Sequence, residues 1–210
     1  MIFQFYRDHI FPHLLDQVMQ VPSLMDARRE LLLAVHGRVL EIGFGTGVNL
    51  PFYQAVDEVV ALEPHQAVFA LAKERVDAAP FHVKHVQASA EALPFPDQSF
   101  QHIVSTWTLC SIAELEQALK EIHRVLAADG VFHLVEHVLH DQPKIAALQH
   151  VLNPVQKRVA DGCHLNRNIE QALTRAGFVF EQCDYFAAAG IPKIGQRMLM
   201  ARVRRAPTNG

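Results

Sequence analysis

The chain has few of the features that mark secreted, membrane-spanning or nucleic-acid-binding proteins. Its three cysteines, at positions 110, 163 and 183, are an odd number at wide spacing, which indicates no disulfide framework. No apolar run approaches the roughly 20 residues that a membrane span needs. Arg7 and Asp8 interrupt the N-terminus before a secretory signal could form. We therefore expect a soluble protein of the reducing cytoplasm.

Neither sign of charge is in excess. The 19 Lys and Arg residues face 22 Asp and Glu residues, a formal net charge of −3 at pH 7. This balance gives no general attraction to nucleic acid, so we expect no nucleic-acid partner. What the chain does have is length and apolar content. Half of its 210 residues are apolar, which is enough to bury a sizeable core.

Strand patterns recur along almost the whole chain. Five short apolar runs predict strands, at residues 38–42, 58–62, 82–87, 100–105 and 131–136. Residues 178–186 and 196–203 predict two more, separated only by the loop 190–195. Because so short a connection cannot cross over a sheet, these two strands should pair antiparallel. The sequence predicts an α/β fold with a mostly parallel sheet, an antiparallel end and helices on both faces.

Helical patterns separate most of these strands. They cover residues 49–56, 66–78, 111–126, 143–160 and 168–176. Ser111 and Glu114 match a capping box, in which the two side chains bond the free amides at the start of a helix. Asp129-Gly130 is expected to end that helix region before the fifth strand. Asn153-Pro154 interrupts the fourth pattern, so we expect that helix in two pieces.

A glycine-rich segment follows the first predicted strand. Residues 41–47 read Glu-Ile-Gly-Phe-Gly-Thr-Gly, and such glycines let a ligand approach the backbone closely at the carboxyl end of a strand. A dinucleotide site needs a third glycine where this chain has Val48. Glu41 before the turn instead suits the cationic end of an amino-acid ligand. Glu63, about 20 residues beyond the first glycine, suits ribose hydroxyls.

With these acids in place, the chain resembles the class I S-adenosylmethionine-dependent methyltransferases of the type 11 group. The resemblance extends over residues 30–205 and includes Glu63-Pro64 and the segments 90–100 and 119–126. It implies a Rossmann-like, seven-stranded sheet with an antiparallel last strand. It also implies S-adenosylmethionine as methyl donor and S-adenosylhomocysteine as product.

The resemblance also implies roles for individual residues. The glycines pass beneath the methionine and ribose, Glu63 holds the ribose hydroxyls, and Thr106 lies near the methionine. Ser89 stands where the family commonly has an Asp for the adenine amino group, which puts that contact in question. The cofactor residues so implied are Glu41, Gly43, Gly45, Thr46, Gly47, Glu63, Pro64, Ser89, Ala90, Glu91 and Thr106.

The second half of the chain is similar to the animal alkyl-thiol methyltransferases, which are attached to the endoplasmic reticulum. The similar segments are residues 108–111, 136–138, 152–154 and 161–167. This similarity implies a small thiol as methyl acceptor. The hydrophobic N-terminal anchor of those enzymes is lacking, so stable membrane insertion is not expected. The alternatives are an oxygen or nitrogen acceptor on a quinone, phenol or phospholipid headgroup, and a non-catalytic S-adenosylmethionine-binding protein.

His137, just after the fifth strand, is the first choice for a general base or acceptor contact. His137 could instead be a structural histidine. Trp107 and Cys163 also have an alternative interpretation, in which they simply fill the core. The predicted acceptor pocket comprises Trp107, Cys110, His137, Asp161 and Cys163.

The 13 histidines raise the question of a metal site. His133, His137 and His140 are the nearest candidates, but residues 131–138 have a strand pattern. Neither a Cys-x-x-Cys nor a His-Glu-x-x-His pattern is present, so we expect no metal.

The N-terminal segment carries its own pattern. Apolar residues from Ile10 to Met19 recur at helical spacing. We interpret residues 1–30 as a helical extension over the cofactor and substrate side, and residues 31–205 as the methyltransferase domain. The alternative is a surface helix that touches lipid transiently.

Overall fold

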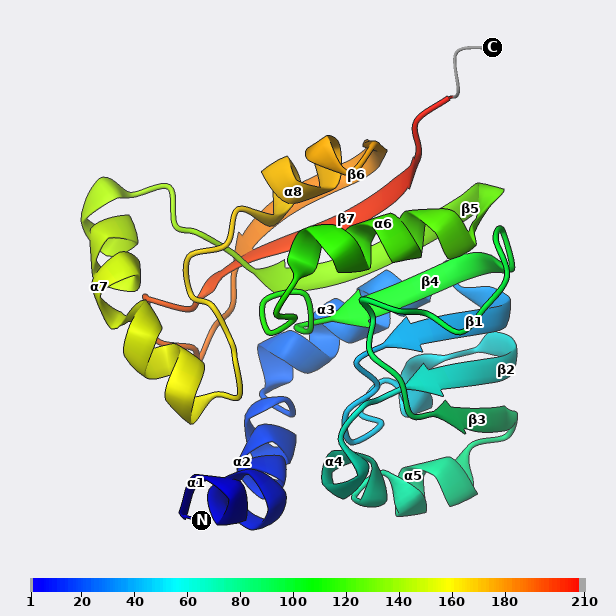
Figure 1. Cartoon of the computed structure of the whole chain (residues 1–210), viewed down its shortest axis with the longest axis horizontal. Helices are drawn as coiled ribbons and strands as arrows, with labels where there is room; N and C mark the ends of the chain where they lie inside the picture. Colours follow the sequence, from blue (N-terminus) through cyan, green and yellow to red (C-terminus); the bar gives the residue numbers. More distant parts are fainter. Residues whose placement is uncertain (1, 208–210) are drawn as a thin grey trace.

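The computed structural model describes residues 2–207, which form a seven-stranded sheet in the order β3-β2-β1-β4-β5-β7-β6 (Figure 1). The strands are β1 (His36–Ile42), β2 (Ala55–Leu62), β3 (His82–Val86), β4 (Phe100–Thr106), β5 (Leu126–His137), β6 (Phe178–Ala187) and β7 (Arg197–Arg205). Strands β1 to β5 pair in parallel, while β7 is antiparallel to both β5 and β6. The expected fold class, with its terminal antiparallel hairpin, is confirmed.

Helices cover both faces of this sheet. They are α1 (Ile2–Phe5), the π-helical η1 (Tyr6–Ile10), α2 (Phe11–Val18), α3 (Pro22–Leu32), the 3-10 turn η2 (Leu50–Phe52), α4 (Gln66–Ala70), α5 (Lys73–Ala78), α6 (Leu115–Val125), α7 (Pro143–Val159) and α8 (Ile169–Arg175). Successive side chains of a strand point to opposite faces. Leu40 therefore belongs to the core cluster shared with α6 and α8, and Val39 to the cluster shared with α3.

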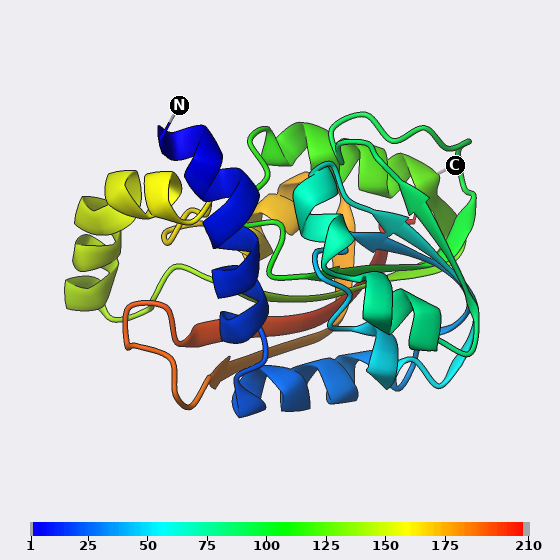
Figure 2. The same cartoon turned by 90° about the horizontal axis from the view of Figure 1, so that it is seen from below.

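The N-terminal helices α1, η1 and α2 lie beyond the carboxyl ends of the parallel strands, on the same side as α7 (Figure 1). Figure 2 shows them crossing in front of the sheet, in blue, with the end of α7 beside them. Tyr6 Oη donates a 2.7 Å hydrogen bond to the carbonyl oxygen of Val159. Leu14 and Val18 of α2 stay about half exposed, so transient lipid contact by this helix stays a prediction. No helix within residues 2–207 is long and apolar enough to cross a bilayer.

Two predicted helices are shorter than expected. Residues 49–56 form only the turn η2, because the chain enters β2 at Ala55. The helix expected at residues 66–78 is divided into α4 and α5 around Leu71 and Ala72. Ala72 is fully buried in the core cluster that the sheet shares with α3. Packing of this residue against the sheet accompanies the break between the two helices.

The ends of α6 were predicted wrongly. Glu114 occupies its N-cap position without a side-chain cap, and the amide of Ser111 instead bonds the Thr108 carbonyl in a turn. At the other end Leu126 is already extended and pairs with Phe100 of β4. The strand therefore begins at Leu126, and Gly130 lies inside it rather than ahead of it.

Helix α7 is continuous through Pro154, contrary to the two pieces expected. A proline inside a helix removes the hydrogen bond to the carbonyl four residues earlier. That carbonyl belongs to His150, which is exposed, so the group faces water and the helix is not forced to break.

Candidate active site

A cavity of about 830 Å³ opens beyond the carboxyl ends of the parallel strands. Its size is that of a pocket for a ligand of a few hundred daltons. Side chains from η1, α2 and α7 line it together with the strand ends. The predicted site residues that line it are Glu41, Gly43, Gly45, Thr46, Glu63, Pro64, Ser89, Ala90, Glu91, Thr106, Trp107, Cys110, His137, Asp161 and Cys163. Of the predicted site residues only Gly47 lies outside this lining.

The glycine turn is held by β2 on one side and is open on the other. The amides of Gly43 and Phe44 both donate to the carbonyl of Leu62 at 3.0 Å. Gly43 has φ +66°, and a Cβ there would lie 2.2 Å from the Thr108 side chain, so only glycine fits. Gly45 has φ +61°, yet the nearest atom to an added Cβ is 3.8 Å away. The turn thus leaves room for a ligand against its backbone.

Glu63 directly follows β2 and has its carboxylate fixed at this turn. One oxygen accepts the Gly45 amide at 3.0 Å and the other the His65 amide at 2.9 Å. Burial raises the pKa of Glu63 even though these hydrogen bonds lower it. A carboxylate has about four acceptor positions, so the two oxygens keep capacity for the hydroxyls of a ribose.

Glu41 is buried, with each oxygen already bonded by the protein. Asn49 Nδ2 donates to one oxygen at 2.9 Å and Tyr53 Oη to the other at 2.7 Å. Burial raises the pKa of Glu41 to about 7, against the lowering effect of these two bonds. The same amide nitrogen of Asn49 lies 3.1 Å from Thr106 Oγ1. Glu41 therefore orients Asn49 and Thr106 at the cavity wall.

Arg28 of α3 is a site residue that sequence reasoning missed. It is 3% exposed and lines the cavity. Its Nε donates to Asn49 Oδ1 at 2.9 Å, and its guanidinium lies 4.5 Å from the centre of the Trp107 ring. The available signal was its position among the apolar residues Leu24 and Leu31 of an amphipathic helix, where a solvated arginine is out of place.

Asp16 of α2 was also missed. Thr46 Oγ1 of the glycine turn donates to it at 2.6 Å, and Arg75 Nη1 lies 2.7 Å away. Asp161, after α7, pairs with Arg7 at 2.8 Å and lies 3.6 Å from His65 Nε2. These two acids join the N-terminal helices to the rest of the cavity wall.

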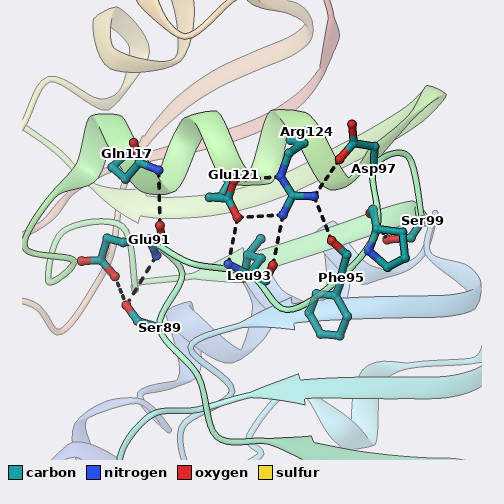
Figure 3. A network of polar contacts seen from close by, with 10 residues as sticks. Ser89, Glu91, Leu93, Phe95, Asp97, Ser99, Gln117, Glu121 and Arg124 are labelled. Atoms are coloured by element: carbon teal, nitrogen blue, oxygen red, sulfur yellow. Dashed lines mark hydrogen bonds and ion pairs between the residues drawn. The ribbon is translucent and has the colours of Figure 1, made fainter.

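The loop expected to border adenine is anchored by Arg124 of α6 (Figure 3). Its guanidinium binds Glu121, the carbonyl oxygens of Leu93 and Phe95, and Asp97 at 2.7–3.0 Å. Glu121 also accepts the Leu93 amide at 2.9 Å. Such a multidentate arrangement fixes the loop backbone.

At the start of the same loop the Ser89 hydroxyl donates to the Glu91 carboxylate, and Gln117 of α6 donates to the Glu91 carbonyl oxygen (Figure 3). Ser89 and Glu91 both line the cavity. The chain therefore offers a serine and a glutamate together where the methyltransferases that it resembles commonly have an aspartate, and a contact of either with adenine stays a prediction.

Cys110, His137 and Cys163 meet at another part of the cavity wall. Their Sγ, Nε2 and Sγ atoms lie within 4.8 Å of one another, and His137 Nε2 is 3.1 Å from Cys163 Sγ. The contact with Cys110, followed by burial, raises the pKa of Cys163 above its usual range. The structure thus brings these three predicted pocket residues together, whereas their roles stay predictions.

Glu136, which sequence reasoning missed, holds the turn that carries Cys110. It is fully buried and accepts the amides of Thr108 and Leu109 at 2.8 Å and that of Cys110 at 3.4 Å. Trp107, at the start of this turn, has φ +53° and donates its ring N–H to Met198 Sδ. A non-glycine residue with positive φ has a strained backbone, which the surrounding structure must hold in place.

The histidines considered as metal ligands lie apart from one another. His133 contacts His102 at 3.0 Å, and His102 in turn contacts His36, so that two buried rings lead to an exposed one. His140 Nδ1 accepts the Gln142 amide. Neither His133 nor His140 belongs to the group that His137 forms with Cys110 and Cys163.

Comparison with known proteins gives the family. Residues 40–134 match the model of a methyltransferase domain. The chain is 32% identical over 176 residues to a thiol S-methyltransferase of Rattus norvegicus, TMT1B, which covers 79% of this chain and 67% of that protein. The chain belongs to the class I S-adenosylmethionine-dependent methyltransferases. As a member of this family it is an enzyme that takes its methyl group from S-adenosylmethionine and releases S-adenosylhomocysteine, which confirms the expected activity and cofactor.

Other methyltransferases are about as similar, and one of them is named for a different acceptor. Human thiol S-methyltransferase TMT1A is 33% identical over 67% of this chain and 59% of its own length. A phosphatidylethanolamine N-methyltransferase of Cereibacter sphaeroides is 33% identical over 55% of this chain and 58% of its own length. The chain thus spans between about half and two thirds of such relatives. A putative methyltransferase structure from Bacillus halodurans superposes with TM-score 0.70 at 18% identity, covering 88% of this chain and all of that one, which supports the fold.

Proposed function

We propose that this methyltransferase transfers the methyl group to a small apolar thiol. The observation that carries the proposal is the cluster of Cys110, His137 and Cys163, because it places sulfur and imidazole groups in the same cavity as the glycine turn. The similarity to thiol S-methyltransferases supports the same acceptor class.

The cofactor fits the wall formed by the strand ends. Here Gly43 and Gly45 pass under the methionine and ribose, and Glu63 accepts the ribose hydroxyls. Ser89 and Glu91 border the adenine with Ala90. Thr106, oriented by Asn49, lies toward the methionine. The open side of Gly45 and the fixed carboxylate of Glu63 support this assignment.

The reaction itself asks little of the protein beyond placement. The leaving sulfur of a sulfonium departs as a neutral thioether and needs no acid, so catalysis consists of aligning the acceptor and removing its proton. Apolar side chains such as Leu15, Ile112 and Met198 line the cavity and suit an apolar acceptor. His137, the titratable ring within the sulfur cluster, is the residue proposed to contact the acceptor.

A screen of thiols, phenols and amines tests the acceptor class. Each compound is incubated with S-adenosylmethionine, and S-adenosylhomocysteine release and the methylated product are followed by mass spectrometry. We expect turnover of small apolar thiols in preference to the other two classes. Turnover of a phenol, a quinol or a phospholipid amine with none of any thiol would assign the second acceptor class, which the similarity to the phospholipid N-methyltransferase favours.

A further inference from the structure

We propose that Cys110, His137 and Cys163 bind one Zn²⁺ ion, and that its fourth position takes the sulfur of the acceptor as a thiolate. This inference deepens the proposed function and rests on it. It departs from the expectation drawn from the sequence, in which no metal was predicted. No sequence pattern could indicate it, because the three residues come from three separate segments.

The donor atoms are close to the arrangement that zinc requires. With Zn–S bonds of about 2.3 Å and a Zn–N bond of about 2.0 Å, the ligand atoms of a tetrahedral site lie roughly 3.5–3.8 Å apart. The three atoms here are within 4.8 Å of one another, and the nitrogen–sulfur distance is 3.1 Å. Small side-chain rotations bring them to the required spacing.

Each ligand is held by a separate part of the fold. The turn that carries Cys110 is fixed by the buried Glu136 through its amides, and His137 is the last residue of β5. Cys163 follows α7, where its amide bonds the Ala160 carbonyl at 3.0 Å and Gln156 Nε2 lies 3.7 Å from its sulfur. A site built on such supports is largely formed before an ion arrives.

The chemistry of the three side chains suits zinc. Two cysteine sulfurs and one imidazole nitrogen are a set of donors that zinc prefers. His137 is 9% exposed and Cys110 is buried, so these donors lie out of contact with bulk water. The protein contacts of the sulfurs are long: Cys110 Sγ lies 3.5 Å from the Trp107 carbonyl oxygen, and Cys163 Sγ lies 3.7 Å from Gln156 Nε2.

The number of ligands matches a catalytic site rather than a structural one. Structural zinc sites have four protein ligands, while catalytic sites have three and leave the fourth position open. Within the described residues the cluster has three such donors, and all three line the cavity that also contains Glu63 and the glycine turn. A ligand in the fourth position would share this cavity with the methyl donor.

The chemistry balances without a separate base. On zinc binding, the two cysteine thiols lose their protons to water, and an acceptor thiol likewise gives its proton to water when its sulfur coordinates. That sulfur then forms a bond to the methyl carbon while the carbon–sulfonium bond breaks, and the electron pair of the broken bond stays on S-adenosylhomocysteine. The product thioether is neutral and a weaker ligand, so it leaves. His137 acts here as a ligand and not as the proton acceptor.

Arg167 adds a positive charge beside the cluster. Its guanidinium donates to the carbonyl oxygens of Leu109 and Ile112, on either side of Cys110. With two thiolates, Zn²⁺ and a neutral imidazole the site has no net charge, and a bound acceptor thiolate makes it −1. A nearby guanidinium stabilises that added charge.

The test measures the metal directly on the full chain. Protein produced with zinc in the medium is analysed by elemental mass spectrometry, and stripped protein is titrated with Co²⁺, whose tetrahedral thiolate complexes have strong visible and near-ultraviolet bands. We expect about one zinc per chain and a tetrahedral cobalt spectrum that shifts when a small apolar thiol is added. Cys163→Ala should lower the zinc content at least tenfold. Cys183→Ala, which alters the exposed cysteine on β6, is the matched control and should retain the zinc.

Folding is checked separately, because Cys110 is buried and Cys110→Ala can unfold the chain. S-adenosylmethionine binding and far-ultraviolet circular dichroism decide which variants are folded, and the cobalt titration of the unaltered chain requires no variant. Less than about a tenth of a zinc per chain, together with no tetrahedral cobalt spectrum, would overturn the proposal.

The outcomes also separate this inference from the proposed function. Full thiol methylation by chelator-stripped protein would overturn the zinc site and leave the thiol acceptor standing. Zinc binding without a thiol-dependent cobalt shift, in a chain that methylates no thiol, would overturn both the acceptor role of the ion and the proposed function.

Discussion

At the scale of single residues, the proposed cofactor site includes two carboxylates whose oxygens the protein has already oriented. Glu63 binds two backbone amides, and Glu41 binds Asn49 and Tyr53. Both are therefore fixed before a ligand arrives, but they differ in what they can still do. Glu63 has acceptor capacity toward the cavity, whereas Glu41 acts through its neighbours.

Replacing Glu63 by alanine should weaken S-adenosylmethionine binding by about 1–3 kcal/mol, roughly 5- to 150-fold, because a charged acceptor is lost. Isothermal titration measures the change. Glu58→Ala is the matched control, since Glu58 lies on the same strand and pairs with Arg38 and His82 away from the cavity. Equal affinities of the Glu63 variant and the unaltered chain would contradict the ribose role.

Glu41 predicts a pH dependence of stability. Its pKa is about 7 in the folded chain and near 4.5 when unfolded, so its favourable contribution is complete below pH 4.5 and is lost as the pH rises through 7. Between pH 5 and 8 the unaltered chain should lose roughly 2–3 kcal/mol of stability relative to Glu41→Gln. Urea unfolding without cofactor measures this difference.

Glu58→Gln is the control for that experiment. The hydrogen bond to Arg38 lowers the pKa of Glu58 below 4.5. The contribution of Glu58 to stability is therefore lost only below about pH 4.5 and should stay constant between pH 5 and 8. A constant difference between the unaltered chain and Glu41→Gln across this range would show that Glu41 does not titrate as inferred.

How much the sequence could predict differs between these residues. The glycine turn and Glu63 were recognisable because each follows a strand, and Glu41 because it directly precedes that turn. Arg28, Asp16 and Glu136 were not, because their importance arises from contacts with segments distant along the chain. The charge of Arg28 amid apolar helix positions was the one local signal.

At the scale of elements, strands were predicted more accurately than helices. A buried parallel strand is a short apolar run, so β1 and β4 were recognisable from composition alone. Helix ends depend on competing pairings: the partner of Leu126 is Phe100 in another strand, and no local pattern reveals it. The break predicted at Pro154 was wrong for a different reason. The carbonyl group that loses its hydrogen bond there lies on an exposed helix face, where water can bond it instead.

The attachment of α2 to the glycine turn can be tested at this scale. Asp16→Ala removes the acceptor of Thr46 Oγ1 and the partner of Arg75. Because this ion pair is partly exposed, we expect a loss of about 1 kcal/mol, or roughly fivefold weaker cofactor binding. Hydrogen exchange of residues 11–18 should also become faster.

Asp26→Ala provides the comparison for Asp16→Ala. Asp26 lies on α3 and pairs with Arg29 on the exposed surface, so its removal should change neither the exchange of α2 nor cofactor affinity. Unchanged exchange in Asp16→Ala would mean that α2 is held over the cavity by its apolar contacts alone.

At the scale of the whole molecule, the cavity is closed by segments from opposite parts of the chain. Tyr6 bonds the end of α7 at Val159, and Arg7 pairs with Asp161 just beyond it. The strand ends supply the floor of the cavity, and the cofactor contacts assigned to them stay predictions. Side chains of η1 and α2 also line the cavity, while the role of residues 1–30 as a cover and the division into two domains stay predictions.

The bonds that join residues 6 and 7 to residues 159 and 161 also tie the N-terminal helices to the segment that carries Cys163. Cys163 lies two residues beyond Asp161, the partner of Arg7. Weakening that ion pair is therefore expected to make this sulfur more accessible to reagents in the solvent. Faster labelling of Cys163 by a water-soluble thiol reagent in Arg7→Ala than in the unaltered chain would measure that consequence.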